Sequence, residues 1–263
     1  MAWFKQSVEF DSDTLKLAHV TDCHLFAKRD GEYFGVNTAE HFLACLSDIA
    51  VKNLDAVIFG GDLTQDHSTQ SYALFAQLIA ESSLTCPVFW TPGNHDDIAL
   101  LTELGNGQIS NAKRLHTANF EVVLLNSKGA TPAGWVSEQH LIEISQCLAE
   151  TQRPTVAFCH HNPLPINGYL DKHMLENGPQ LLNTLNNSHC VSWLFHGHVH
   201  NAYEHNYRNI QVIATPASSV QFTKHTPDWQ QQNLGPAYRL ITLSQRAATN
   251  MLECETELVW LSE

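Results

Sequence analysis

Short apolar runs alternate with longer amphipathic stretches over most of the chain. Runs such as 15–21 (LKLAHVT) and 56–59 (AVIF) are typical of strands buried on both faces. Segment 38–52 instead repeats apolar residues at helical spacing, with Phe42, Leu46 and Ile49 on one face. The pattern predicts strands at 15–21, 56–59, 88–91, 122–126, 155–159 and 191–195, and helices at 38–52, 71–81, 137–150 and 180–185.

The carboxyl-terminal part is richer in strand patterns. Segments 211–214, 238–242 and 253–260 have them, and the last alternates along its length. A β-α-β order followed by a strand-rich tail predicts a layered α/β fold with at least one mixed sheet. Repeats and low-complexity linkers are absent from the sequence, so we expect a single domain over 1–263.

Polar residues follow almost every predicted strand. The segments are 21–24 (TDCH), 60–62 (GGD), 91–96 (TPGNHD), 159–163 (CHHNP) and 196–200 (HGHVH). Each alone is weak evidence, because Gly and Asp also form turns and helix caps. In layered α/β proteins, however, ligand sites lie beyond the carboxyl ends of strands. We therefore expect the five loops to converge on one cleft, with an extended backbone aiming His198 and His200 to one side.

These donors suit particular metals. Carboxylate, imidazole and amide groups without a thiolate are ligands for Mn, Fe, Zn or similar first-row ions. Seven candidate ligands are too many for one tetrahedral ion but fit two ions that share a carboxylate. Two such ions can clamp a phosphoryl group and generate hydroxide at neutral pH.

Composition limits the partners. The chain has 14 Lys+Arg against 27 Asp+Glu, a formal charge of −13, and 16 histidines. Binding of a nucleic-acid polymer relies on clustered Lys and Arg, so the charge argues against such a partner. A small phosphate-containing substrate remains compatible, because bound metal ions reverse the local field.

Compartment is indicated by the cysteines and by the N-terminal segment. That segment lacks the apolar stretch preceded by positive charge that is typical of a secretory signal. No run approaches the roughly 20 apolar residues of a membrane span. The seven cysteines are scattered and never spaced C-x-x-C, a pattern typical of free thiols in a reducing compartment. We expect a cytoplasmic protein without a membrane partner. None of these features predicts an oligomeric state.

The ordered motifs resemble those of calcineurin-like metallophosphoesterases, over roughly residues 15–243. They are Asp22-x-His24, Gly61-Asp62, Gly93-Asn94-His95-Asp96, His161-x-Pro163 and Gly197-His198-x-His200. Within that superfamily the chain most resembles the bacterial class III 3′,5′-cyclic AMP phosphodiesterases. Segments 35–38 (GVNT), 163–165 (PLP), 214–216 (ATP) and 220–222 (VQF) carry this closer similarity. The resemblance implies a four-layer α/β/β/α sandwich of two mixed β-sheets flanked by helices.

The resemblance also implies residue roles. One metal ion would be held by Asp22, His24 and His200, and the other by Asn94, His161 and His198, with Asp62 bridging. The implied catalytic residues are His95, which would protonate or support the leaving oxygen, and Asn94. The implied substrate contacts are His24, Asp62, Asn94, His95 and His200. The implied cofactors are two di- or trivalent first-row ions, Fe or Mn before Zn or Co. The implied reaction is hydrolysis of 3′,5′-cyclic AMP to 5′-AMP by a bridging hydroxide.

Two alternatives to this function remain open. A broader phosphodiesterase or phosphomonoesterase would use the same residues. A non-catalytic metal-binding scaffold is less favoured, because all seven ligand positions are filled.

Three residue assignments are also open. Successive strand-end side chains face opposite ways, so His160 and His161 are not expected at the same ion, and only the His-x-Pro spacing favours His161. Gln65 stands where some relatives carry an acidic residue that orients the catalytic histidine, and Asp66 follows it. Trp229, with segment 230–232 (QQQ), could cover a base, but its distance from the cleft is open. The other histidines are expected in surface or core roles: His19, His41, His67, His116, His140, His173, His189, His205 and His225.

Overall fold

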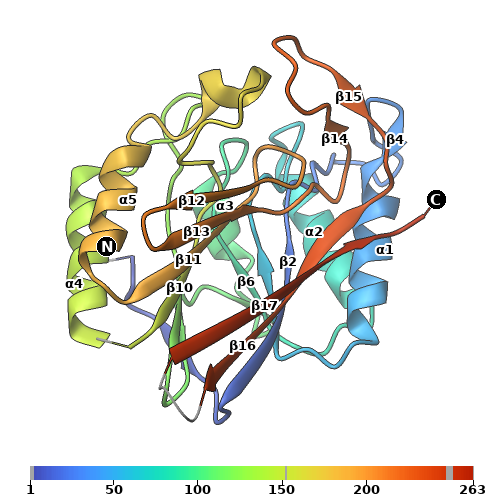
Figure 1. Ribbon diagram of the computed structural model, residues 1–263. Helices are drawn as coiled ribbons and strands as arrows, with labels where there is room; N and C mark the ends of the chain where they lie inside the picture. Colours follow the sequence, from blue (N-terminus) through green and yellow to red (C-terminus); the bar gives the residue numbers. More distant parts are fainter. Residues whose placement is uncertain (1–2, 152, 247–250, 263) are drawn as a thin grey trace.

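In the computed structural model, which describes residues 3–151, 153–246 and 251–262, two β-sheets pack face to face between layers of helices (Figure 1). The first sheet has the order β17-β16-β2-β5-β6-β7. Strands β2, β5, β6 and β7 are parallel, whereas β16 is antiparallel to both β2 and β17. The bounds are β2 Thr14–Val20, β5 Ala56–Phe59, β6 Val88–Trp90, β7 Ile109–Ser110, β16 Ala237–Arg246 and β17 Met251–Trp260.

The second sheet has the order β1-β8-β9-β10-β11-β13-β12. Its central strands β9, β10, β11 and β13 are parallel, and antiparallel pairs lie toward both edges. The bounds are β1 Ser7–Glu9, β8 Arg114–His116, β9 Glu121–Leu124, β10 Thr155–Phe158, β11 Val191–His196, β12 Glu204–Tyr207 and β13 Ile210–Ala214. Two hairpins stand apart from the large sheets: β3 (Glu32–Tyr33) with β4 (Val36–Asn37), and β14 (Gln221–Phe222) with β15 (Gln231–Gln232).

Helices cover the outer face of each sheet (Figure 1). Helices α1 (Thr38–Ala50), α2 (Thr69–Glu81) and α3 (Ile98–Glu103) pack on the first sheet, and α4 (Glu138–Thr151) and α5 (Gly178–Asn187) on the second. A 3-10 turn, η1, spans Tyr169–His173. Among the described residues no helix is both long and apolar enough to cross a bilayer.

The alternation of strand side chains explains why the strands are apolar throughout. Ile58 of β5 and Phe158 of β10 meet in the core between the two sheets. Their chain neighbours Phe59 and Ala157 turn outward and pack under the helices. For example, the ring centroids of Phe59 and of Phe75 in α2 lie 4.8 Å apart. The four-layer α/β/β/α sandwich of two mixed sheets is thus confirmed.

The longer predicted elements are present, with ends that shift by a few residues. Helix α3 and the two- to four-residue strands β1, β3, β4, β7, β8, β12, β14 and β15 were not predicted. The missed strands lack the continuous apolar run of equally short strands such as β5 (AVIF) and β6 (VFW), and their pairing depends on distant strands. The single-domain prediction stays a prediction.

Candidate metal centre and active site

The five predicted loops lie beyond the carboxyl ends of β2, β5, β6, β10 and β11, and they converge. Backbone hydrogen bonds join them directly: Asp22 N donates to Gly61 O at 2.9 Å, and Gly197 N donates to His160 O at 3.1 Å. Because these strands are parallel, their carboxyl ends share one edge of each sheet, and the sandwich sets the two edges side by side. Residues separated by up to 178 positions in the chain, such as Asp22 and His200, thereby come into contact.

Several candidate ligands have strained backbones. Left-handed φ angles occur at Asp22 (56°), His24 (46°), Asp62 (54°), His198 (67°) and His200 (51°). Non-glycine residues rarely adopt this conformation, and where they do the strain is often part of a functional site. The extended backbone expected at His198 and His200 is therefore wrong, and these two side chains enter different groups of ligand atoms.

Glycines beside these residues let the loops approach closely. A Cβ atom on Gly93 would collide with the carboxylate of Asp62, and one on Gly197 would collide with Thr21 and Asp22. The glycines of the Gly-Asn-His-Asp and Gly-His-x-His motifs thus leave room for the two aspartates.

The first group of ligand atoms comes from Asp22, His24 and His200, which lie within 4.8 Å of one another and are buried. Nδ1 of His200 donates to the carbonyl of Val220 at 2.7 Å, which turns Nε2 toward the other two residues. That Nε2 lies 3.4 Å from Asp22 Oδ1 and 3.0 Å from Nε2 of His24. Burial and the neighbouring His200 lower the pKa of His24 to about 3, which keeps its ring neutral.

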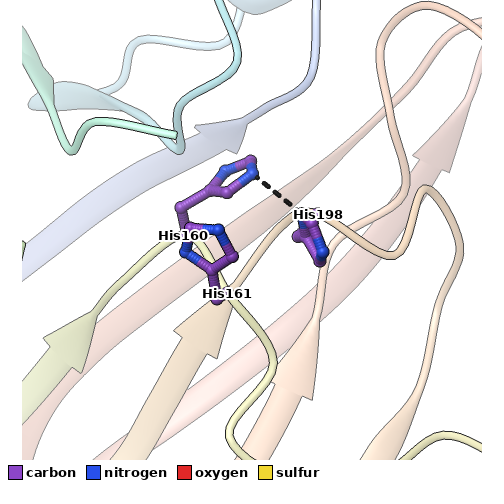
Figure 2. Close-up of side chains that lie close together, drawn as sticks. All are labelled: His160, His161 and His198. Carbon is purple, nitrogen blue, oxygen red and sulfur yellow. Dashed lines mark hydrogen bonds between the residues drawn. The ribbon is translucent and has the colours of Figure 1, made fainter. Parts of the chain in front are cut away.

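The second group consists of His160, His161 and His198, also within 4.8 Å of one another (Figure 2). Nε2 of His161 and Nε2 of His198 are buried without a hydrogen-bond partner. Ser127 Oγ lies 2.9 Å from Nδ1 of His161 and holds that ring. Burial keeps the pKa values of His161 and His198 well below their usual range, so both rings are neutral donors.

His160 departs from expectation, because it faces the same cluster as His161. Strand β10 ends at Phe158, so both histidines lie in the loop, where strand alternation no longer applies. Nδ1 of His160 donates to Gly60 O at 2.8 Å, which directs Nε2 to within 3.2 Å of Asp62 Oδ2. Burial opposes a charge on this ring, but Asp62 outweighs it and raises the pKa of His160 to about 9. This nitrogen therefore attracts a cation, whether a proton or a metal ion.

Asp62 lies between the two groups. Its Oδ2 is 3.8 Å from Nε2 of His24 in one group and 3.2 Å from Nε2 of His160 in the other. Its Oδ1 accepts a hydrogen bond from the backbone N–H of His95 at 2.9 Å. Although burial opposes ionisation, the nearby His160 and His95 keep the pKa of Asp62 well below its usual range.

Asp96 organises the loops, a role that the sequence did not reveal. Its carboxylate accepts hydrogen bonds from the backbone N–H groups of Asp62, Leu63 and Gly93, each at 2.8 Å. These bonds tie the loop after β5 to the loop after β6. The fourth position of the Gly-Asn-His-Asp motif was the available signal.

His95 is held by His67, not by Gln65. The two rings stack with centroids 5.3 Å apart and an interplanar angle of 7°, and Nδ1 of His67 donates to the carbonyl of His95 at 3.0 Å. Gln65 Oε1 instead lies 2.8 Å from Nδ1 of His24. His67 was expected only in a surface or core role. The sequence offered no spacing signal for its contact with His95.

Asn94 lies beside His95 and has an unpaired side-chain oxygen. Its Oδ1 is buried without a hydrogen-bond partner, and its backbone carbonyl accepts from Lys128 Nζ at 2.8 Å. A cavity of about 210 Å³ opens above these residues. Its lining is His24, Tyr33, Asp62, Asn94, His95, Pro132, Leu170, His173, His198, His200, Phe222 and Trp229.

These side chains fit first-row metal ions. Imidazole nitrogens and carboxylate oxygens face one another over 3.0–3.9 Å, and Nε2 of His161, Nε2 of His198 and Oδ1 of Asn94 are buried without a hydrogen-bond partner. Their second ring nitrogens are held by outer partners such as Val220 O, the arrangement common to metal-ligating histidines. The set contains no thiolate, which suits Fe, Mn, Zn or Co.

Comparisons with known proteins agree with this geometry. The model of the calcineurin-like phosphoesterase family matches residues 15–202. A protein of Pseudoalteromonas sp. (strain SM9913), named as a probable cyclic nucleotide phosphodiesterase, is 59% identical over the full length of both chains. The 3′,5′-cyclic adenosine monophosphate phosphodiesterase CpdA of Escherichia coli (strain K12) is 34% identical over 87% of this chain and 85% of its own.

Solved structures share the fold at low sequence identity. A dimetal phosphatase from Danio rerio superposes with a TM-score of 0.62 and 15% identity, covering 87% of this chain and 95% of its own. The purple acid phosphatase PPD1 of yellow lupin gives a TM-score of 0.63 and 15% identity, covering 94% of this chain and 54% of its own.

Proposed function

The chain belongs to the calcineurin-like phosphoesterase family, and we propose that it hydrolyses a phosphodiester, namely 3′,5′-cyclic AMP to 5′-AMP. The observation that carries this proposal is the pair of ligand-atom groups on either side of Asp62. The names of the relatives support the cyclic nucleotide as substrate.

We assign the ligands as the motifs imply. Asp22, His24 and His200 would hold one ion, Asn94, His161 and His198 would hold the other, and Asp62 would be shared between them. The chemistry supplied by two bound ions is neutralisation of the phosphate charge and activation of a water for attack on phosphorus.

The remaining steps are carried out by side chains at the cavity floor, the end of the cavity where the candidate metal ligands lie. The phosphate lies over Asp62, between Asn94 and His95, whose side chains line the cavity. As the bond between phosphorus and the 3′ oxygen breaks, that oxygen needs a proton or an electrostatic partner, and His95 is placed to supply it. His67 and the bond from His95 N to Asp62 Oδ1 hold the imidazole in position.

The seven cysteines support a reducing cytoplasm as the place of action, because all of them are free thiols in the structure.

A substrate panel tests the proposal. Metal-loaded protein is assayed with added Mn²⁺ against 3′,5′-cyclic AMP, 2′,3′-cyclic AMP, an aryl phosphodiester and an aryl phosphomonoester. We expect 3′,5′-cyclic AMP to be the best substrate. Turnover of the aryl esters alone would support phosphoesterase chemistry but contradict the assignment of a cyclic nucleotide as the substrate. Fewer than one metal ion per chain, with activity indifferent to a chelator, would contradict the two-ion centre.

The His95→Ala variant tests the role of that side chain. We expect kcat to fall by about 10²–10⁴-fold, the range for loss of a general acid, while the metal content stays at two ions per chain. His205→Ala in β12, outside the cavity lining, is the matched control and should keep full activity. Full activity in the His95 variant would exclude the role.

A further inference from the structure

Four aromatic side chains form a lip above the candidate metal centre: Tyr33, Phe34, Phe222 and Trp229. They come from two hairpins that lie at the same end of the molecule, β3–β4 and β14–β15 (Figure 1). Trp229 lies in the connection between β14 and β15, with its ring centroid 4.7 Å from Phe222 and 6.1 Å from Phe34. The aromatic lip therefore joins segments about 200 positions apart.

The aromatic lip contacts the candidate metal ligands at the end of the cavity where the phosphate is proposed to bind. Phe222 stacks on His200 with centroids 4.1 Å apart and an interplanar angle of 14°. Tyr33 stacks on His24 with centroids 5.0 Å apart and an angle of 22°. Tyr33, Phe222 and Trp229 line the same 210 Å³ cavity as the candidate ligands. A small ligand with its phosphate at the floor must therefore direct its other end at these rings.

Phe34 occupies a costly position. It and Gly35 form the two-residue turn of the β3–β4 hairpin, with φ angles of 52° and 76°. Such turns favour Asn-Gly or Asp-Gly, and a bulky residue in the left-handed region is strained. The Phe34 side chain is nevertheless 44% exposed, so burial in the core does not explain it. Trp229, which faces it, is 40% exposed. An exposed Trp229 in the cavity lining, with an exposed Phe34 beside it on a strained turn, indicates a ligand-binding surface.

The residues that line the cavity away from the metal centre, here called the wall, indicate which chemical group of a ligand binds there. Away from the floor, the cavity is lined by Tyr33, Pro132, Leu170, His173, Phe222 and Trp229. Among these described residues there is no carboxylate, lysine or arginine, so the wall offers ring faces, apolar surface and one imidazole. A flat heteroaromatic ring stacks well on such a surface.

We propose that Trp229, supported by the neighbouring ring of Phe34, stacks on the nucleobase of the substrate and thereby determines specificity for nucleotides over other phosphodiesters. This inference rests on the proposed function, because it assumes that the phosphate binds at the metal centre. Tyr169 supports the indole from behind, with ring centroids 5.0 Å apart and an interplanar angle of 83°. Trp229 is thus a binding residue and takes no part in the bond cleavage.

Equilibrium binding measurements separate the contribution of the base to affinity from that of the phosphate. Dissociation constants of 5′-AMP and of ribose 5-phosphate are measured by calorimetry on Mn²⁺-loaded protein, for the wild type, Trp229→Ala, Trp229→Phe and Phe34→Ala. Ribose 5-phosphate carries a hydroxyl at C1′ where 5′-AMP carries the base, so the ratio of the two constants reports the contribution of the base. Trp260→Ala is the matched control, because Trp260 is also partly exposed but lies in β17 and outside the cavity lining.

We expect Trp229→Ala to weaken 5′-AMP binding by about 5- to 150-fold, the range for loss of one base–aromatic stack, and to leave ribose 5-phosphate within about twofold. Trp229→Phe should restore most of the affinity, Phe34→Ala should show a smaller loss, and Trp260→Ala should show none. Equal wild-type affinity for the two ligands, or equal losses for both in Trp229→Ala, would overturn the proposal. Because no turnover is measured, this result is independent of whether cyclic AMP is hydrolysed.

Discussion

The two groups of candidate ligand atoms differ in charge. Asp22, His24 and His200 combine a carboxylate with two imidazoles, whereas the second group, His160, His161 and His198, contains imidazoles alone. Ligands without a carboxylate give a cation less electrostatic stabilisation than a set that contains one. The second group therefore depends more strongly on Asp62, whose Oδ2 lies 3.2 Å from Nε2 of His160. The comparison teaches that one carboxylate makes a single centre of two unequal halves.

The largest expected effect comes from removing this shared carboxylate. Asp62→Ala should lower the metal content from two ions per chain to below one, and should lower hydrolysis by at least about 10²-fold. Elemental analysis and the substrate panel measure both, with circular dichroism to verify folding. Asp30→Asn, on an exposed loop, is the control and should change neither. Retention of two tightly bound ions would show that the halves do not share Asp62.

A smaller effect distinguishes the adjacent histidines of the second group. His161→Ala should leave about one ion per chain, because Nε2 of His161 has no other partner. His160→Ala should still bind two ions at saturating metal, with affinity reduced by about 10–100-fold, since His160 also bonds to Gly60 O and acts on Asp62 from outside the ligand set. Metal titration followed by elemental analysis distinguishes the two variants. The opposite pattern would make His160 the ligand.

The smallest effect is expected at His67, which touches neither group and supports His95. His67→Ala should lower kcat by about 2–10-fold through loss of one hydrogen bond and one ring contact, with the metal content unchanged. His67→Phe keeps the stacked ring and loses the hydrogen bond, so its kcat should lie between those of the wild type and His67→Ala. If His67→Ala were as slow as His95→Ala, His67 would have to act on the substrate itself.

Much of the fold could be predicted because the buried strands are continuous apolar runs, even where they have only three or four residues. The apolar runs of β2, β5 and β10 are buried on both faces, and helices α1 and α2 repeat apolar residues at helical spacing. The hairpins β3–β4 and β14–β15 were missed because strands of two residues have no measurable period. Those two hairpins carry the aromatic lip. Trp229 was therefore singled out as a residue that could cover a base, but its place in the cavity lining was not predicted.

Local rules failed where the backbone leaves regular structure. Alternation predicted opposite directions for His160 and His161, but the strand ends before both, and they enter one group. An extended backbone was expected at His198 and His200, but left-handed conformations send them to different groups. Such conformations are imposed by contacts from other loops, as when Asp22 accepts from the backbone N–H of His198.

By itself, the sequence determined the order of strands and helices, the layered class and the five loops with their donor types, because each depends on neighbouring residues in the chain. The tertiary structure alone decided which donors share a group, that His67 holds His95, that Asp96 ties two loops, and that Trp229 reaches the cavity. His67 and His95 lie 28 positions apart, Asp62 and Asp96 lie 34 apart, and Phe34 and Trp229 lie 195 apart, and only the tertiary fold brings each pair into contact. Residue types are local properties, but distances between side chains are not.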